Sequence, residues 1–167
     1  MKINTSRFGE IEINEDLIFN FIEPILGYDS LQKYVLVDNQ PDSPFKWLQS
    51  MENGDVAFPV TFPTYFGIDY QFVIPEDKSK KLELTGADNL ITFNIVCIPQ
   101  GKPEESTINL AGPIVVNAEN KNGMQLVLTN TKYTVKHKLF DEKVLKQQKQ
   151  KKSKELSEEK EETKKGN

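Results

Sequence analysis

Nine prolines spread over the first 113 residues limit the folds open to this 167-residue chain more than any other feature. Proline lacks a backbone donor and clashes with the preceding helical turn, so long helices are excluded from this part of the chain. The prolines are Pro24, Pro41, Pro44, Pro59, Pro63, Pro75, Pro99, Pro103 and Pro113. Between them, apolar and polar residues alternate with a period close to two, which is typical of strands.

Short strands are therefore expected throughout residues 2–140. The pattern is clear at 10–13, where isoleucines alternate with glutamates, and at 90–98, where both faces are mostly apolar, as in a covered central strand. Asn122-Gly123 is a strong turn signal and predicts a hairpin over 113–129. Further strands are expected at 2–6, 17–21, 34–38, 45–49, 56–62, 70–74, 114–116, 124–128 and 133–137.

The predicted fold class is all-β. About ten short strands in a body of this length favour a small antiparallel β-barrel-like domain over a sandwich. One short helix is expected over 76–84, because Pro75 precedes a charged run of good helix formers.

Charge and apolar content change after residue 140. Residues 1–140 carry 12 Lys and Arg against 18 Asp and Glu, a net charge of −6, whereas residues 141–167 carry 9 against 7, a net charge of +2. Three aliphatic residues in the second part cannot offset the entropy of ordering it. We expect one domain over 1–140 and a Lys/Glu-rich tail over 141–167, disordered or, as the alternative, a frayed exposed helix.

Residue types needed for common catalytic and metal sites are scarce. His137 and Cys97 are the only histidine and cysteine, which excludes an internal disulfide and a Cys/His zinc site. His137 is expected to face solvent at the end of the last strand, and Cys97 to be a small buried residue on an apolar face. We expect neither enzyme activity nor a metal or cofactor. An acid–base pair of carboxylates, as in a hydrolase, stays open as an alternative.

The acidic body also argues against binding of nucleic-acid phosphates, which requires clustered Lys and Arg. The aromatic run that ends at Phe66 is followed by Asp69 and not by a basic residue. An oligonucleotide-binding barrel is the alternative reading. The longest uncharged stretches have 13 residues and contain proline, and the N-terminus mixes both charges, so we expect no membrane contact and a cytoplasmic location.

The segment 44–50 holds the only tryptophan. Alternation places Phe45 and Trp47 on one side of a strand and Leu48 on the other. Two interpretations stay open for Trp47: packing in the core, or an apolar patch for a protein partner.

Several segments along residues 2–140 form a recognisable set. They are Thr5-Ser6-Arg7-Phe8-Gly9-Glu10-Ile11-Glu12, Gly27-Tyr28, Tyr34-Val35-Leu36-Val37, Pro44-Phe45-Lys46-Trp47-Leu48-Gln49-Ser50, Asn109-Leu110-Ala111-Gly112-Pro113-Ile114-Val115-Val116-Asn117 and Gln125-Leu126-Val127-Leu128. In this order and spacing the set resembles the FliW family of flagellar assembly factors. Tyr28 stands where Phe is more usual, and the tail has no counterpart in typical members.

The resemblance implies a small antiparallel β-barrel-like fold and a regulatory binding protein without enzyme activity. Family members bind the RNA-binding repressor CsrA, relieve its repression of flagellin mRNA, and bind flagellin, which titrates the factor away. For this chain it implies CsrA and flagellin as protein partners, no direct nucleic-acid contact, and a monomer when free. The residues it suggests for partner binding are Phe45, Trp47, Leu48, Gln49, Ser50, Asn109 and Asn117.

Overall fold

The computed structural model describes residues 1–140 of the chain. These residues contain eleven strands, four short 3-10 helices and one α-helix, α1 (Glu76–Lys81), which begins directly after Pro75 as predicted. The strands are β1 (Lys2–Thr5), β2 (Gly9–Glu12), β3 (Phe19–Phe21), β4 (Lys33–Val37), β5 (Lys46–Ser50), β6 (Ala57–Thr61), β7 (Leu90–Cys97), β8 (Thr107–Ile108), β9 (Ile114–Asn117), β10 (Asn122–Gln125) and β11 (His137–Lys138).

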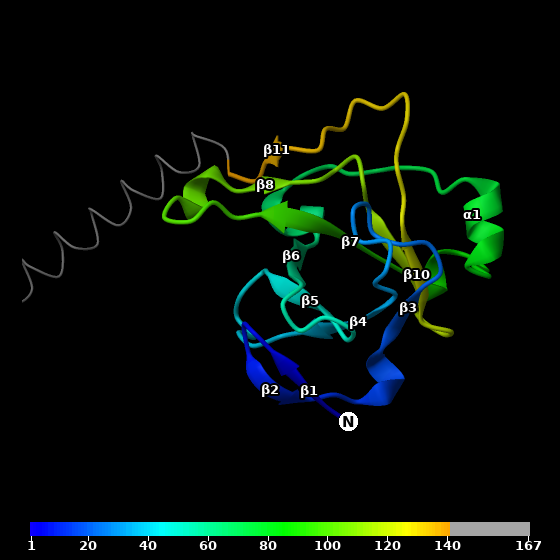
Figure 1. The fold of residues 1–167 in the computed structure, drawn as a ribbon. Helices are drawn as coiled ribbons and strands as arrows, with labels where there is room; N and C mark the ends of the chain where they lie inside the picture. Colours follow the sequence, from blue (N-terminus) through cyan, green and yellow to red (C-terminus); the bar gives the residue numbers. More distant parts are fainter. Residues whose placement is uncertain (141–167) are drawn as a thin grey trace, which may run out of the picture.

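Seven of these strands form a closed barrel (Figure 1). The order around the ring is β7-β6-β5-β4-β3-β10-β9, and β9 pairs with β7 to close it. All neighbouring pairs in the ring are antiparallel except β3 and β10, which run parallel. Every strand of the ring therefore has a neighbour on both sides. The predicted all-β, barrel-like fold is confirmed, with one parallel pair that the sequence pattern did not indicate.

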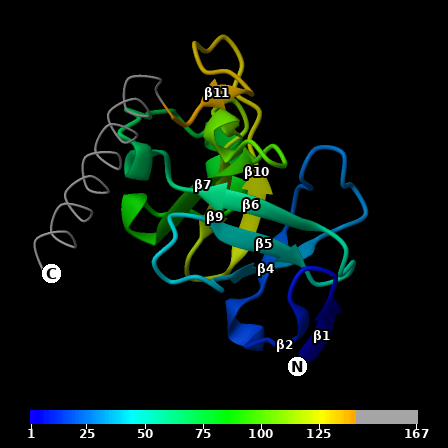
Figure 2. The same cartoon turned by 90° about the vertical axis from the view of Figure 1, so that its left-hand side faces the viewer.

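Two further pairings lie outside the ring. β1 and β2 form a separate antiparallel hairpin, which Figure 2 shows beside β4 at one end of the molecule. β8 pairs with the C-terminal end of β7, and β11 pairs with β8. The hairpin covers part of the outside of the barrel wall, where Arg7 and Phe8 contact Trp47 of β5.

The barrel interior is filled by one apolar cluster. Its buried members are Phe19, Phe21, Ile25, Leu31, Tyr34, Leu48, Val60, Phe93, Ile114 and Val116. β10 lies against this cluster at Gly123, where an added Cβ would lie 3.0 Å from Val116 Cγ2 and 3.3 Å from the Phe21 ring. The absence of a side chain at Gly123 thus makes room for the Phe21 ring in the core.

Strand β7 is covered on both faces, as its sequence predicts. Phe93 lies in the interior cluster, whereas Leu90 and Val96 contact two outer clusters. The prediction for Cys97 is wrong, because this residue is exposed. Beyond Ile95, β7 extends past its pairing with β6 and pairs only with the two-residue strand β8, so this end of the strand is poorly covered.

Some predicted strands differ from the observed ones. Within residues 1–140, the segment 70–74 pairs with no strand, and its residues Tyr70, Phe72 and Ile74 pack against the outer clusters instead. The segment 133–137 contributes only its last residue, to β11. β10 begins already at Asn122, because the left-handed turn residue is Lys121, with φ of 64°, and not Gly123.

The predicted tail 141–167, and with it the expected domain boundary, lies outside the described residues and stays a prediction. His137 is exposed on β11, as predicted. Among residues 1–140, no helix is long and apolar enough to cross a membrane.

Candidate functional site

The Trp47 ring lies on the outside of the barrel wall and is half-buried. Its neighbour Leu48 points the other way, into the interior cluster, so the alternation predicted for this strand is confirmed. Arg7 Cζ lies 3.9 Å from the centroid of the Trp47 ring, and the Phe8 ring meets it edge-on at 6.1 Å between centroids. The tip of the β1–β2 hairpin therefore covers the tryptophan.

The hairpin is fixed to the turn between β5 and β6. The Ser6 backbone N–H donates to the Gly54 carbonyl at 3.1 Å, and the Ser6 hydroxyl donates to the Asp55 carboxylate. A Cβ on Gly54 would overlap the Asn4 carbonyl oxygen, so the approach of β1 to this turn requires glycine. These contacts hold the hairpin at a fixed position relative to the barrel wall.

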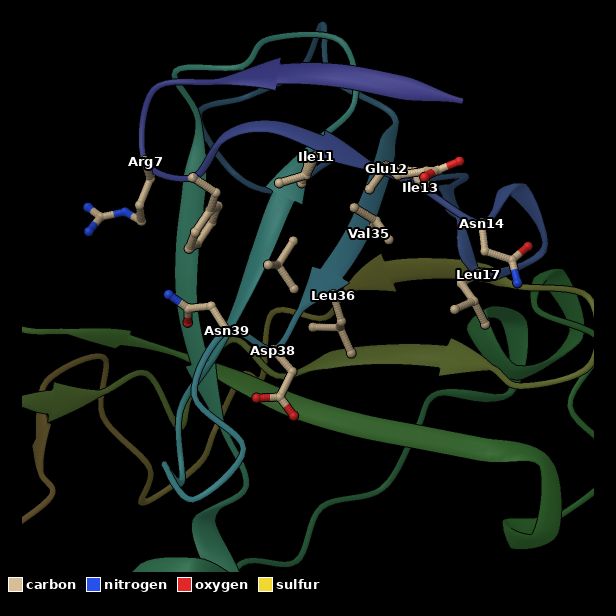
Figure 3. Close-up of a pocket in the computed structure, with 12 residues that line it drawn as sticks. Arg7, Ile11, Glu12, Ile13, Asn14, Leu17, Val35, Leu36, Asp38 and Asn39 are labelled. Atoms are coloured by element: carbon tan, nitrogen blue, oxygen red, sulfur yellow. The ribbon is translucent and has the colours of Figure 1, made fainter.

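An open groove of about 770 Å³ lies between the hairpin and β4. Figure 3 shows β2 above the groove, with Val35 and Leu36 of β4 below it. Its walls are mainly apolar, formed by Phe8, Ile11, Ile13, Leu17 and residues 35–37. Leu17 has 54% of its surface exposed, so part of the apolar wall of the groove is open to solvent.

Charged side chains surround this apolar groove. Arg7, Glu12 and Asp38 line it. The Asp38 carboxylate lies 3.6 Å from the ammonium of Lys46, and both side chains are 40% exposed. Glu15 and Asp16 lie in the 3-10 helix η1 (Glu15–Leu17) at one end of the groove. The rim of the groove is therefore mostly acidic.

Three of the residues that the resemblance suggests for partner binding lie inside the barrel wall. Leu48, Gln49 and Ser50 have no exposed surface. The Gln49 side-chain amide donates to three backbone carbonyls of residues 50–56, at 3.0 to 3.3 Å. The Ser50 hydroxyl accepts the backbone N–H groups of residues 52 and 53. Their polar groups thus hold the β5–β6 turn that carries the hairpin.

None of the other suggested residues lines the groove, although Trp47 contacts Arg7 and Phe8, which do. Asn117 is buried, and its side-chain amide donates to the carbonyls of Leu82 at 2.8 Å and Glu83 at 3.2 Å, behind α1. Asn109 is half-buried and its side chain accepts the backbone N–H of Ala111. Phe45 is half-buried beside Phe66. A role in partner binding stays a prediction for all seven suggested residues.

Hydrogen bonds and burial within the fold account for the shifted pKa values. Hydrogen bonds from Lys78 lower the pKa of the Glu23 carboxyl, which keeps it ionised beside two lysines. Burial raises the pKa of the Tyr34 and Tyr70 hydroxyls to about 12. Within residues 1–140, no group of three His, Cys, Asp or Glu side chains could hold a metal ion.

Comparison with known proteins gives the family. The family model described as FliW protein matches residues 2–139. The chain belongs to the FliW family. The resemblance noted in the sequence is thereby confirmed, and the match spans every element that builds the groove.

Similar proteins described as flagellar assembly factor FliW are found in several bacteria. The flagellar assembly factor FliW of Caldanaerobacter subterraneus subsp. tengcongensis is 43% identical over 143 residues, which is 85% of this chain and 95% of that protein. FliW of Thermotoga maritima is 38% identical over 137 residues, 82% of this chain and 92% of that protein. A crystal structure of the flagellar assembly factor FliW matches with a TM-score of 0.79 and 33% identity, covering 86% of this chain and all of that one.

The site residues suggested from the FliW motifs do not line the groove, although the motif segments 5–12 and 34–37 contain several residues that do. The missed residues are Arg7, Leu17 and the outward side of β4. A signal for them existed in the alternation at 10–13, which gives β2 one apolar face, and in the leucine at position 17, which directly follows two acidic residues. The alternation does not indicate which face of the barrel this hairpin covers.

Proposed function

We propose that this FliW-family chain supports flagellar assembly as a regulator that binds proteins. It binds the RNA-binding repressor CsrA and relieves repression of flagellin mRNA, and it binds flagellin, which titrates it away. The proposal includes a cytoplasmic location, a monomeric free form and no enzyme activity. The observation that carries it is the rigidly anchored apolar groove with an acidic rim between β2 and β4.

The charge of the chain supports a basic partner. Residues 1–140 have a net charge of −6, Glu12 lines the groove, and Glu15 and Asp16 lie in η1 between the lining residues Asn14 and Leu17. A protein that binds RNA presents Lys and Arg to phosphates. An acidic protein is attracted to such a basic surface and, once docked beside it, repels the RNA. Release of RNA without direct contact to the RNA follows from this electrostatic argument.

A gel-shift assay with CsrA and a flagellin leader RNA tests the proposal. We expect the chain to release the RNA from CsrA without shifting the RNA alone. For the same release of RNA, the variant Leu17→Asp should be required at a concentration at least about tenfold higher. It places a charge where the partner would bury an aliphatic side chain. Val73→Asp is the matched control, because Val73 is 85% exposed and does not line the groove.

The outcomes separate three alternatives. Unchanged CsrA–RNA affinity at saturating protein would overturn the proposal. Equal activity of Leu17→Asp and the unchanged chain would move the contact away from the groove. Direct RNA binding that weakens with salt would favour an oligonucleotide-binding barrel instead.

A further inference from the structure

Two stretches of strand edge at the groove have no partner strand among residues 1–140: the outer edge of β2, and the edge of β4 beyond its pairing with β3. β2 pairs with β1 only. β4 pairs with β3 only as far as Phe19 and Tyr34, because the preceding residues of the chain turn away into η1. Figure 3 shows β2 as the strand of the hairpin that lies nearer to β4.

The pairing register of the hairpin shows which groups of β2 are available. The Ile13 N–H donates to the Met1 carbonyl at 2.7 Å, so residues 9, 11 and 13 bond toward β1. The N–H and C=O groups of the residues between them, Glu10 and Glu12, point to the opposite side. No backbone hydrogen bond within the described chain uses these groups of Glu10 or Glu12.

The pairing register of β4 likewise shows which of its backbone groups are available. The Phe21 N–H donates to the Gln32 carbonyl at 2.7 Å, so residues 32, 34 and 36 bond toward the β3 side. The register would place Leu17 opposite Leu36, but the Leu17 N–H donates to the Asn14 carbonyl at 3.0 Å. The backbone of Leu36 has no partner on this side in the part of the chain that the structure describes.

We propose that the groove binds an extended segment of a partner protein as an added β-strand, with apolar residues alternating with basic ones. Backbone groups of Glu12 and Leu36 would pair with the added strand. Its apolar side chains would cover Ile11, Leu17 and Val37, and its Lys or Arg side chains would face the acidic rim. The inference rests on the proposed function and names the form in which a partner segment is bound.

The charge of the rim decides the kind of segment. Glu12, Glu15 and Asp16 form no ion pair within residues 1–140, whereas Glu10 and Asp38 lie 3.6 Å from Lys2 and Lys46. Charged residues also protect strand edges from aggregation. Protection of the β2 edge from aggregation does not by itself account for the apolar groove beside it, which includes the half-exposed Leu17. A strand that is both apolar and basic complements both features.

Synthetic peptides test the inference with the full chain. The probe is a nine-residue peptide of alternating lysine and valine, read by fluorescence anisotropy. We expect binding of this peptide, about tenfold weaker binding of its form N-methylated at alternate residues, and no binding of the glutamate–valine peptide. N-methylation removes donors along one edge and keeps the side chains, so it tests strand pairing without changing the protein.

A pair of variants at one position tests the protein side. Glu12→Pro removes the outward N–H at an edge position that tolerates proline, and Glu12→Gln removes only the charge. We expect Glu12→Pro to bind the lysine–valine peptide more weakly than Glu12→Gln, and the bound peptide to slow hydrogen exchange at Glu12 and Leu36. If Glu12→Pro unfolds the hairpin, the N-methylated peptide still decides the question.

Equal binding of the methylated and unmethylated peptides, or no binding of either, would overturn the inference. Occupation of the groove by a second copy, seen as a dimer lost in Glu12→Pro, or by the chain's own residues 143–154, would also overturn it. Release of RNA from CsrA together with no peptide binding would refute binding of the partner as an added strand, but not the proposed function. Peptide binding without RNA release would refute the proposed function alone.

Discussion

The buried Tyr34 and the half-buried Tyr70 differ in the hydrogen bonding of their hydroxyl groups. The Tyr70 hydroxyl donates to the Leu110 carbonyl at 2.6 Å. The Tyr34 hydroxyl, inside the barrel, has no hydrogen-bond partner among the described residues. A buried polar group without a partner lowers stability, whereas a paired one raises it modestly. The same substitution should therefore have opposite effects at the two positions.

We expect Tyr34→Phe to leave the free energy of unfolding at pH 7 unchanged or raise it by about 1 kcal/mol, and Tyr70→Phe to lower it by about 1–2 kcal/mol. Urea denaturation followed by circular dichroism measures both. Burial raises the pKa of both hydroxyls from 10.0 to about 12. The unfolded chain therefore releases these protons first, and stability falls as the pH rises from 10 to 12. Tyr34→Phe should reduce this alkaline loss; an equal destabilisation by both variants at pH 7 would contradict the assignment.

Single polar residues also mark what the sequence does not reveal. Gln49 and Asn117 belong to segments that identify the family, yet their amides bond backbone carbonyls inside the fold. The alternation assigns each residue to a face of a strand. It does not indicate whether a turn six residues away brings carbonyls within reach of the side chain. Such contacts depend on tertiary structure, so buried and exposed polar residues look alike in the sequence.

At the scale of elements, the hairpin depends on its contact with the β5–β6 turn. Gly54→Ala should displace β1, because a Cβ at this position overlaps the Asn4 carbonyl oxygen. We expect a loss of about 1–3 kcal/mol, the usual cost of overpacking. Hydrogen exchange should accelerate at β1 and β2, while the amides of β9 and β10 serve as the internal control. Unchanged exchange in the hairpin would show that the turn does not position it.

Helix α1 is joined to the loop after β3 by one carboxylate. Lys78 Nζ lies 2.7 and 2.8 Å from the two oxygens of Glu23, and Lys81 Nζ lies 3.0 Å from the nearer one. The hydrogen bond from Lys78 is the main cause that lowers the pKa of Glu23 below its ordinary value of 4.5. This contribution to stability is present above pH 4.5 and is lost as the pH falls through the lowered pKa.

Glu23→Gln should therefore be less stable than the unchanged chain at pH 7, and the difference should disappear on acidification below pH 4.5. Thermal unfolding at a series of pH values measures this difference. Glu76→Gln is the control, because Glu76 is paired with Lys80 at 3.3 Å while its side chain is 85% exposed. A difference that persists at low pH would show that Glu23 acts through packing and not through its charge.

The existence of these elements was easier to predict than their pairing. Strands at 34–38, 45–49, 56–62 and 90–98 were found within one or two residues of their bounds, because alternation is a local property. Pairing β3 with β10 joins residues 20 and 122, and no local pattern indicates that contact. The two-residue strand β8 is too short to show any periodicity at all.

For the whole molecule, the closed ring and the hairpin together define the candidate site. The sequence predicted a barrel-like fold and an acidic body, since strand number, length and charge are sums over the chain. It did not predict the groove, because a groove forms between β2 and β4, which are separated by 20 residues and belong to different sheets. Surface sites of this kind depend on how sheets dock.

Ring closure also constrains how the chain can fold during synthesis. β9 must pair with β7, and β10 must lie between β9 and β3. Until residue 125 has left the ribosome, β3 and β9 have exposed edges and the interior is open on one side. A nascent chain of this family therefore gains its full barrel only when nearly the entire domain has emerged, and up to that point it needs protection from pairing with other chains.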